Sequence, residues 1–110
     1  MSHVTTHVLD AVSGTPAVGL AVALSQRGSD GWDSIDSAVT DADGRVSDFG
    51  PDHLEPGVYR VHFDTGMYFS KPEQPTFYPE VTIVFEIIDG AHYHVPLLLS
   101  PFAYSTYRGS

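Results

Sequence analysis

Short runs in which large apolar residues alternate with smaller or polar ones recur along the chain, separated by clusters of Gly, Pro, Asp and Ser. In the run GLAVALSQ, Leu20, Val22 and Leu24 fall on one face of an extended strand, because successive side chains point to opposite sides. No long stretch shows the period of about 3.6 residues that is typical of an amphipathic helix. The pattern predicts an all-β protein in which two sheets pack as a sandwich.

The expected elements are seven strands, with room for an eighth, and one short helix. The helix lies at residues 66–71 and ends before Pro72, which cannot continue a helix. The turn DADGR, residues 41–45, reverses the chain after the third strand, and Gly44 tolerates the positive φ angle that a tight reversal needs. The expected strands span residues 4–11, 19–26, 32–40, 58–64, 81–88, 92–100 and 102 to about 108.

Length and composition exclude several classes of protein. The 110 residues are the size of one domain, and we expect a single β-sandwich over residues 1–110. Fourteen acidic residues against five scattered basic ones give a net charge of −9, which argues against binding to nucleic acid or anionic membranes. The absence of cysteine excludes disulfides and thiolate metal sites. With no membrane-length apolar run and no signal-peptide pattern, we expect a cytoplasmic protein.

The strand at residues 92–100 has one face that fits neither a core nor a typical solvent surface. Its apolar face, which we expect to pack in the core, holds Tyr93, Val95, Leu97 and Leu99. Its other face holds His92, His94, Pro96 and Leu98. A face that mixes imidazoles with apolar side chains is typical of a surface that another subunit covers.

The first strand repeats this mixture, because Thr5, His7 and Leu9 share one face. If both strands turn these faces toward one groove, His7 and His94 converge in it. Arg45 follows a glycine turn, a position from which a side chain is easily directed into a cleft. The simpler interpretation of each residue is structural: a lone histidine on a strand is usually hydrogen-bonded in place, and a lone arginine is usually a solvated cation.

The other histidines and the chain end also allow two interpretations. We expect His3 and His53 to be solvated, and His62 to be partly buried and structural. His92 and His94 are two residues apart, so both could reach a metal, but without cysteine and with few carboxylates nearby a zinc site is the minor alternative. The ending YRGS is either a frayed terminus or part of a binding site, because it combines a phenol, a guanidinium and a hydroxyl.

The segments HVLDAVSGTPAVGLAVAL, TDADGR and HYHVPLLLSPFAYSTYRGS, with the strand layout between them, resemble the transthyretin family over almost the whole chain. The ending YRGS, residues 107–110, resembles the signature of the enzymatic branch of that family, the 5-hydroxyisourate hydrolases. The hormone-carrying branch lacks this ending and lacks histidines at the positions that match His7 and His94. The resemblance therefore favours the enzyme, with a non-catalytic carrier of a small aromatic ligand as the alternative.

What the resemblance implies for the fold is a transthyretin-like β-sandwich of two four-stranded sheets with one short helix. Members of the family are homotetramers, a dimer of dimers around a central channel, and the active sites lie in that channel. The resemblance thus implies that the mixed faces described above line the channel of a tetramer, where another copy of the chain covers them.

The resemblance also implies a reaction and a set of site residues. Hydrolysis of the N1–C6 amide bond opens the six-membered ring of 5-hydroxyisourate, in urate breakdown, and gives 2-oxo-4-hydroxy-4-carboxy-5-ureidoimidazoline. No metal and no organic cofactor are implied. The implied catalytic residues are His7, Arg45, His94 and Ser110, and the implied substrate-binding residues are His7, Arg45 and Tyr107. The motif leaves the roles of Arg108 and His92 open.

Overall fold

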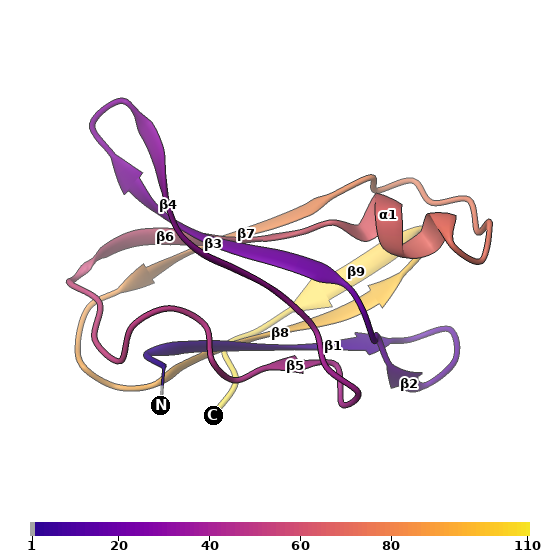
Figure 1. Ribbon diagram of the computed structural model, residues 1–110, viewed down its shortest axis with the longest axis horizontal. Helices are drawn as coiled ribbons and strands as arrows, with labels where there is room; N and C mark the ends of the chain where they lie inside the picture. Colours follow the sequence, from indigo (N-terminus) through magenta and orange to yellow (C-terminus); the bar gives the residue numbers. More distant parts are fainter. Residues whose placement is uncertain (1) are drawn as a thin grey trace.

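The computed structural model describes residues 2–110 as two β-sheets packed face to face, with one short helix at an end of the sandwich (Figure 1). The first sheet contains β1 (Val4–Asp10), β2 (Thr15–Pro16), β5 (Arg45–Val46), β8 (Tyr93–Ser100) and β9 (Ala103–Thr106). The second sheet contains β3 (Ala21–Gly28), β4 (Gly31–Val39), β6 (Gly57–Phe63) and β7 (Val81–Ile87). The strand orders are β2-β1-β8-β9, with β5 paired to β1, and β4-β3-β6-β7.

The prediction of an all-β sandwich is confirmed, and all seven expected strands are present with bounds that shift by about two residues at most. The sequence did not predict β2 and β5, which have two residues each and both pair with the outer edge of β1. Strands this short contain too few residues to show an alternation. They give the first sheet five strands where the resemblance implied four.

The core lies between the two sheets, and the predicted inward faces supply it. Tyr59, Phe63 and Phe49 are the largest side chains that are completely buried there. The predicted apolar face of β8 is also buried, from Tyr93 to Leu99. Burying a large apolar side chain stabilises the fold by about 1.5–3 kcal/mol. The inner face of the first sheet is therefore filled by core packing. A functional site on this sheet must lie on its outer face.

The prediction of a solvated His3 is wrong, because this residue is only 4% exposed. Its Nδ1 accepts the backbone N–H of Leu54 at 2.8 Å, and its Nε2 lies 3.1 Å from the carbonyl oxygen of Asp89. These contacts fix the segment before β1 between the loop that contains Leu54 and the loop that contains Asp89. His53 is exposed and His62 is half-buried, as expected.

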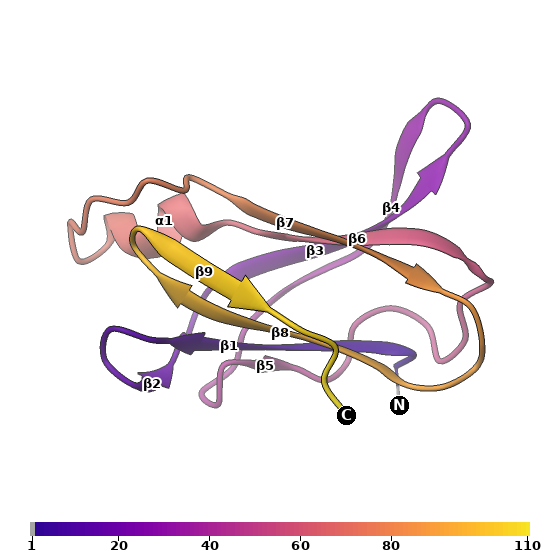
Figure 2. The ribbon, with the colours of Figure 1, turned by 180° about the vertical axis from the view of Figure 1, so that it is seen from behind.

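The helix α1 (Thr65–Ser70) covers one end of the sandwich (Figure 2). It lies one residue earlier than predicted, since the carboxylate of Asp64 accepts the backbone N–H of Met67 at 3.3 Å and caps it. Tyr68 donates a hydrogen bond to Oδ2 of Asp10 at 2.8 Å and joins the helix to the end of β1. Within residues 2–110, no helix combines the length and apolar character that crossing a bilayer requires.

Candidate active site

The first sheet places side chains from three strands on one outer face. β1 runs parallel to β8, with Thr5 opposite His94 and His7 opposite Pro96. β5 lies antiparallel along the other edge of β1 and places Arg45 opposite His7. Because side chains alternate along a strand, all of these residues project away from the core. The mixed faces that the sequence indicated on two strands therefore form one continuous surface.

Arg45 is held in place by the turn that precedes β5. Asp41 Oδ1 accepts the backbone N–H groups of Arg45 (3.0 Å) and Asp43 (2.8 Å), and these hydrogen bonds lower the pKa of Asp41. Gly44 has a φ of 72°, and a Cβ there would lie 2.5 Å from the backbone oxygen of Val8. The turn requires glycine on both counts, and it fixes the start of β5 against β1.

His94 is held between β1 and the C-terminal tail. Its Nδ1 lies 2.8 Å from Oγ1 of Thr5. On the opposite edge of the ring, a Cβ added at Gly109 would lie 2.5 Å from His94 Cδ2, so the tail approaches this closely only because residue 109 is glycine. Nε2 is the ring nitrogen left to contact a bound molecule. Burial of the ring and the nearby charge of Arg45 lower the pKa of His94, so the imidazole is neutral at neutral pH.

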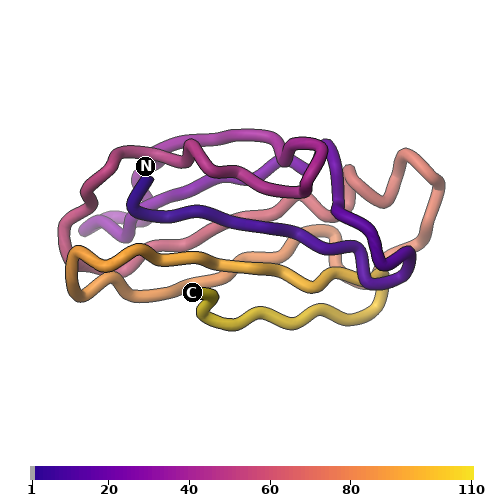
Figure 3. Tube along the Cα trace, turned by 90° about the horizontal axis from the view of Figure 1, so that it is seen from below, coloured from indigo at the N-terminus to yellow at the C-terminus, as the bar shows by residue number. Residues whose placement is uncertain are grey.

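The tail reaches His94 because its pairing with β8 stops and then resumes. β9 pairs with β8 up to Thr106. The next residue, Tyr107, lies opposite Pro96 in the same register, and proline has no N–H to donate, so the ladder is interrupted. It resumes at Gly109, whose N–H donates to the carbonyl of His94 at 2.9 Å. The tail is therefore bound beside β8 (Figure 3) rather than frayed.

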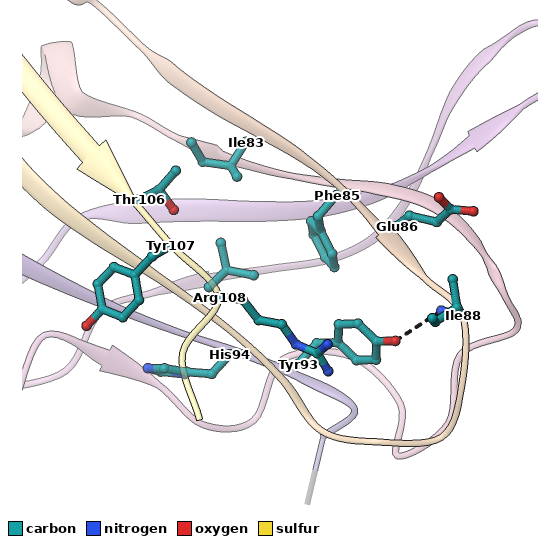
Figure 4. A pocket seen from close by; sticks show the side chains of 10 residues that line it. Ile83, Phe85, Glu86, Ile88, Tyr93, His94, Thr106, Tyr107 and Arg108 are labelled. Carbon is teal, nitrogen blue, oxygen red and sulfur yellow. Dashed lines mark hydrogen bonds between the residues drawn. The ribbon is translucent and has the colours of Figure 1, made fainter.

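Tyr107 and Arg108 point to opposite sides of the tail. Figure 4 shows Tyr107 and His94 on one side and Arg108 beside Tyr93 on the other. The guanidinium carbon of Arg108 lies 4.3 Å from the centre of the Tyr93 ring, within the range of a cation–π contact. Tyr93 in turn donates a hydrogen bond to Asp89 at 2.9 Å. Arg108 thus anchors the tail to the sandwich and faces away from the side on which His94 lies.

These elements surround a cleft of about 210 Å³ on the outer face of the first sheet. Its lining residues are Thr5, Arg45, Ser47, His92, His94 and Ser110. Of the predicted catalytic residues, Arg45, His94 and Ser110 therefore meet in one cleft although they come from three distant segments. His7 is not part of the lining but lies directly opposite Arg45. Tyr107, the predicted substrate-binding residue, is 60% exposed and lines a second cavity, whose walls also include His94.

Comparison with known proteins identifies the family. A profile of the HIUase/Transthyretin family matches residues 4–109. The chain belongs to this family. A protein from Salmonella dublin named 5-hydroxyisourate hydrolase is 47% identical over 106 residues, which cover 94% of this chain and 78% of the relative.

Solved structures of the HIUase/Transthyretin family show the same fold in both branches. The 5-hydroxyisourate hydrolase of Klebsiella pneumoniae matches with a TM-score of 0.88 and 37% identity, covering 97% of this chain and 98% of that one. Transthyretin from Sparus aurata matches with a TM-score of 0.92, also at 37% identity, covering 99% and 97%. Since the two likenesses are equivalent, the fold does not separate an enzyme from a carrier, and the argument depends on the cleft.

Three residues of the cleft were not among the predicted site residues: Thr5, Ser47 and His92. Each lies two positions from a residue that was singled out, namely His7, Arg45 or His94, and the strand period of two puts it on the same face. The signal was therefore present in the sequence. Nothing in the sequence showed that the site extends to the next residue on the same face, two positions along the chain.

The two imidazoles on either side of residue 93 stack on each other, and both contact Thr5. Their ring centroids are 6.3 Å apart, with His92 Nε2 at 3.0 Å and His94 Nδ1 at 2.8 Å from the Thr5 hydroxyl. Among residues 2–110, no group of three or more His, Asp or Glu side chains is arranged to hold a metal ion. In this geometry the histidine pair is organised around a hydroxyl.

A larger cavity, of about 380 Å³, lies between β7 and the tail (Figure 4). Its walls are mostly apolar and include Ile83 and Phe85 of β7, Val95 of β8 and Thr106 of β9. It opens between the edge strands of the two sheets, whereas the cleft that carries Arg45 lies on the outer face. His94 lines both cavities, whereas Arg45 and Ser110 line only the smaller cleft.

Proposed function

We propose that this protein hydrolyses 5-hydroxyisourate at the N1–C6 amide bond of its six-membered ring. The observation that carries the proposal is the meeting of Arg45, His94 and Ser110 in one cleft. Relatives named 5-hydroxyisourate hydrolase support the choice of substrate. Opening a cyclic amide needs an activated water, a positive group for the carbonyl oxygen and a proton for the leaving nitrogen, and the cleft offers a group for each.

His94, with His7 beside the cleft, is the base in this mechanism. The lowered pKa of His94 keeps its imidazole neutral at neutral pH, so Nε2 can accept a proton from water. The water oxygen attacks C6, the C6–N1 bond breaks, and the imidazolium returns the proton to N1. Acid–base assistance of this kind is typically worth about 10²- to 10⁴-fold in rate.

Arg45 holds the substrate oxygen and stabilises the negative charge that develops as C6 becomes tetrahedral. The turn at residues 41–44 fixes its backbone before the substrate arrives, and such preorganisation is what makes a donor effective. Arg45 also gives the cleft a positive group on a protein whose net charge is −9. An anionic, oxygen-rich ring is drawn to this cation in spite of the acidic surface.

Ser110 and Tyr107 position the water or the ring in this proposal. Ser110 lines the cleft directly. Tyr107 lies on the same side of the tail as His94 (Figure 4), although it is not a wall of the cleft in the single chain. Holding the reactants in an attack geometry lowers the barrier, because the entropy of bringing them together is lost on binding and not in the reaction step.

We propose further that the protein assembles as a homotetramer, a dimer of dimers. β7 and β9 are the edge strands of their sheets and leave backbone groups free for pairing. Apolar side chains that are exposed near these edges and on the outer face of the first sheet include Val84, Ile88, Leu98, Phe102, Tyr104 and Tyr107. A second pair of chains on the outer face would enclose the cleft as a channel and bring Tyr107 toward a site.

A cytoplasmic location is part of the proposal, because a chain without cysteine suits a reducing compartment. The competing function is a carrier of a small aromatic ligand, in analogy to sea bream transthyretin, which was solved in complex with thyroxine. Two imidazoles and an arginine on one polar surface fit hydrolysis better than the binding of an apolar ring.

The test is the ultraviolet absorbance of 5-hydroxyisourate generated in situ from urate and urate oxidase. We expect its decay to accelerate in proportion to added protein, and heat-denatured protein to have no effect. An unchanged decay would reject the hydrolase, and calorimetric binding of an aromatic ligand would then support the carrier. Size-exclusion chromatography should give a mass near four times the 11.9 kDa chain; a monomer would reject the tetramer.

A further inference from the structure

The hydroxyl of Thr5 lies between two imidazoles. Its Oγ1 is 2.8 Å from Nδ1 of His94 and 3.0 Å from Nε2 of His92. Thr5 is buried on β1, whereas His92 is exposed just before β8. One buried hydroxyl therefore connects a solvent-facing ring to the ring that the mechanism uses as a base.

The number of hydrogens and lone pairs limits how this trio is arranged. A hydroxyl has one hydrogen and two lone pairs, and a neutral imidazole has one N–H, so Thr5 either donates to one ring and accepts from the other or accepts from both. If Thr5 accepts from both rings, Nε2 of His94 keeps its lone pair. If Thr5 donates to His92, it accepts the Nδ1–H of His94, and Nε2 of His94 keeps its lone pair. If Thr5 donates to His94 instead, the hydrogen of that ring sits on Nε2, which then has no lone pair to accept a proton.

The surroundings favour the arrangement in which Thr5 donates to His92. Arg45 lines the same cleft, and a lone pair facing a cation is lower in energy than an N–H whose positive end faces it. Gly109 packs against the Cδ2–Cγ edge of the His94 ring and Thr5 binds Nδ1, so Nε2 is the ring nitrogen that neither contact occupies. His92 is exposed, so its own hydrogen can sit on Nδ1 in solvent while Nε2 accepts from Thr5.

We propose that Thr5 and His92 are positioning residues that keep the hydrogen of His94 on Nδ1 and leave Nε2 free to take a proton from water. This inference rests on the proposed hydrolase function, in which the proton on Nε2 is passed to N1 of the substrate. When Nε2 takes up the proton, His94 still donates from Nδ1 to Thr5, so the hydrogen bonds survive the whole cycle. The proton passes from water to Nε2 and then to the leaving nitrogen.

Paired valine substitutions on β1 test the role of the hydroxyl. Thr5→Val keeps the shape of the side chain and removes its hydrogen bonds, so we expect kcat to fall about tenfold with little change in KM. Thr5→Ser restores a hydroxyl and should restore kcat. Thr6→Val is the matched control, because Thr6 faces the core and donates to the Val95 carbonyl at 2.7 Å. It removes a comparable bond and should leave kcat near the wild-type value.

A double-mutant cycle tests whether His92 acts through Thr5. His92→Phe removes the acceptor that holds the hydroxyl hydrogen, so that hydrogen is free to turn toward His94, and kcat should fall. In the Thr5→Val background the same substitution should cost nothing further, since the connection is already broken. Independent, multiplicative losses would show that His92 acts by another route and would reject its positioning role.

Nitrogen-15 NMR of the imidazoles gives a readout that does not depend on activity. At pH 8 the wild-type spectrum should place the His94 hydrogen on Nδ1, and Thr5→Val should give a mixture of the two tautomers. A wild-type His94 with its hydrogen on Nε2, or an unchanged kcat in Thr5→Val, would overturn the proposal. A wild-type protein inactive on 5-hydroxyisourate would reject the hydrolase function instead, while the NMR result would still decide how Thr5 orients His94.

Discussion

A titratable group with a shifted pKa lies at each end of the first sheet, Tyr68 of α1 at one end and His94 of β8 at the other. The two groups differ in what the shift does. At the end that α1 covers, burial and the adjacent Asp10 raise the pKa of Tyr68 to about 12. At the other end, burial and the charge of Arg45 lower the pKa of His94. The first group keeps its proton throughout the physiological range, whereas the second is neutral at neutral pH and can accept a proton from water.

The hydrogen-bond partners differ in the same way. At the helix end both oxygens of Asp10 are occupied, one by Tyr68 at 2.8 Å and the other by the backbone N–H of Val12 at 3.0 Å. At the cleft end Thr5 occupies one nitrogen of His94, which leaves the other for substrate or water. A shifted pKa therefore marks a functional group here only where an unused atom of that group faces a cleft.

The largest expected effect separates the cleft from the rest of the molecule. His94→Ala or His7→Ala should reduce kcat/KM for 5-hydroxyisourate by about 10²- to 10⁴-fold, because the base and its partner are removed. Circular dichroism and size-exclusion chromatography should show an intact fold and assembly. His62→Ala is the matched control on the second sheet, where its ring contacts Glu80 at 3.1 Å. Near-normal rates in both cleft variants would remove these histidines from the mechanism.

Arg45→Met should come next, with a loss of about 10²- to 10³-fold in kcat/KM from the missing charge at the carbonyl oxygen. The variant should also raise the pKa of His94, since the charge of Arg45 helps to lower it. Activity needs neutral His94 and is lost as the pH falls through its pKa, so the acid limb of the pH–rate profile should move to higher pH.

The matched control for Arg45 is Lys71→Met, which removes an exposed cation at the helix end of the molecule. It should change neither the rate nor the acid limb. If Arg45→Met lowered the rate but left the acid limb in place, Arg45 would bind substrate without acting on His94. If both variants moved the limb equally, the effect would come from the net charge of the protein.

Period-two alternation predicted much of this site from the sequence. It separated the core face of β8 from the face that carries His94, and it placed His7 on a matching face of β1. The glycine turn indicated a directed Arg45, which the structure places opposite His7. These features are local, because each depends on neighbours that are close in the sequence.

Features that depend on distant segments were not predicted. His3 is buried because the loop that contains Leu54 folds over it, and no pattern near residue 3 indicates this. The side to which Arg108 points depends on the pairing of the tail with β8, which resumes at Gly109 opposite His94 and places the guanidinium over Tyr93. The place of Ser110 in the site came from the family resemblance and not from its position at the end of the chain.

The smallest expected effect lies at the helix end. Tyr68→Phe removes the hydrogen bond to Asp10 and should lower the free energy of unfolding by about 1 kcal/mol, since the pair is only partly buried. The rate of hydrolysis should be unchanged. Burial and the hydrogen bond to Asp10 together raise the folded-state pKa of Tyr68 to about 12 from its ordinary 10.0. The stabilising effect of the hydrogen bond is therefore complete below pH 10 and is lost as the pH rises through 12.

Urea denaturation of wild type and Tyr68→Phe at several pH values measures this difference. The gap in unfolding free energy should stay constant between neutral pH and pH 9 and close as the pH approaches 12. A variant that unfolded like wild type but hydrolysed substrate more slowly would show that the helix end communicates with the cleft along β1. The division between a structural end and a catalytic end of the sheet would then be wrong, because Asp10 and Thr5 lie on the same strand.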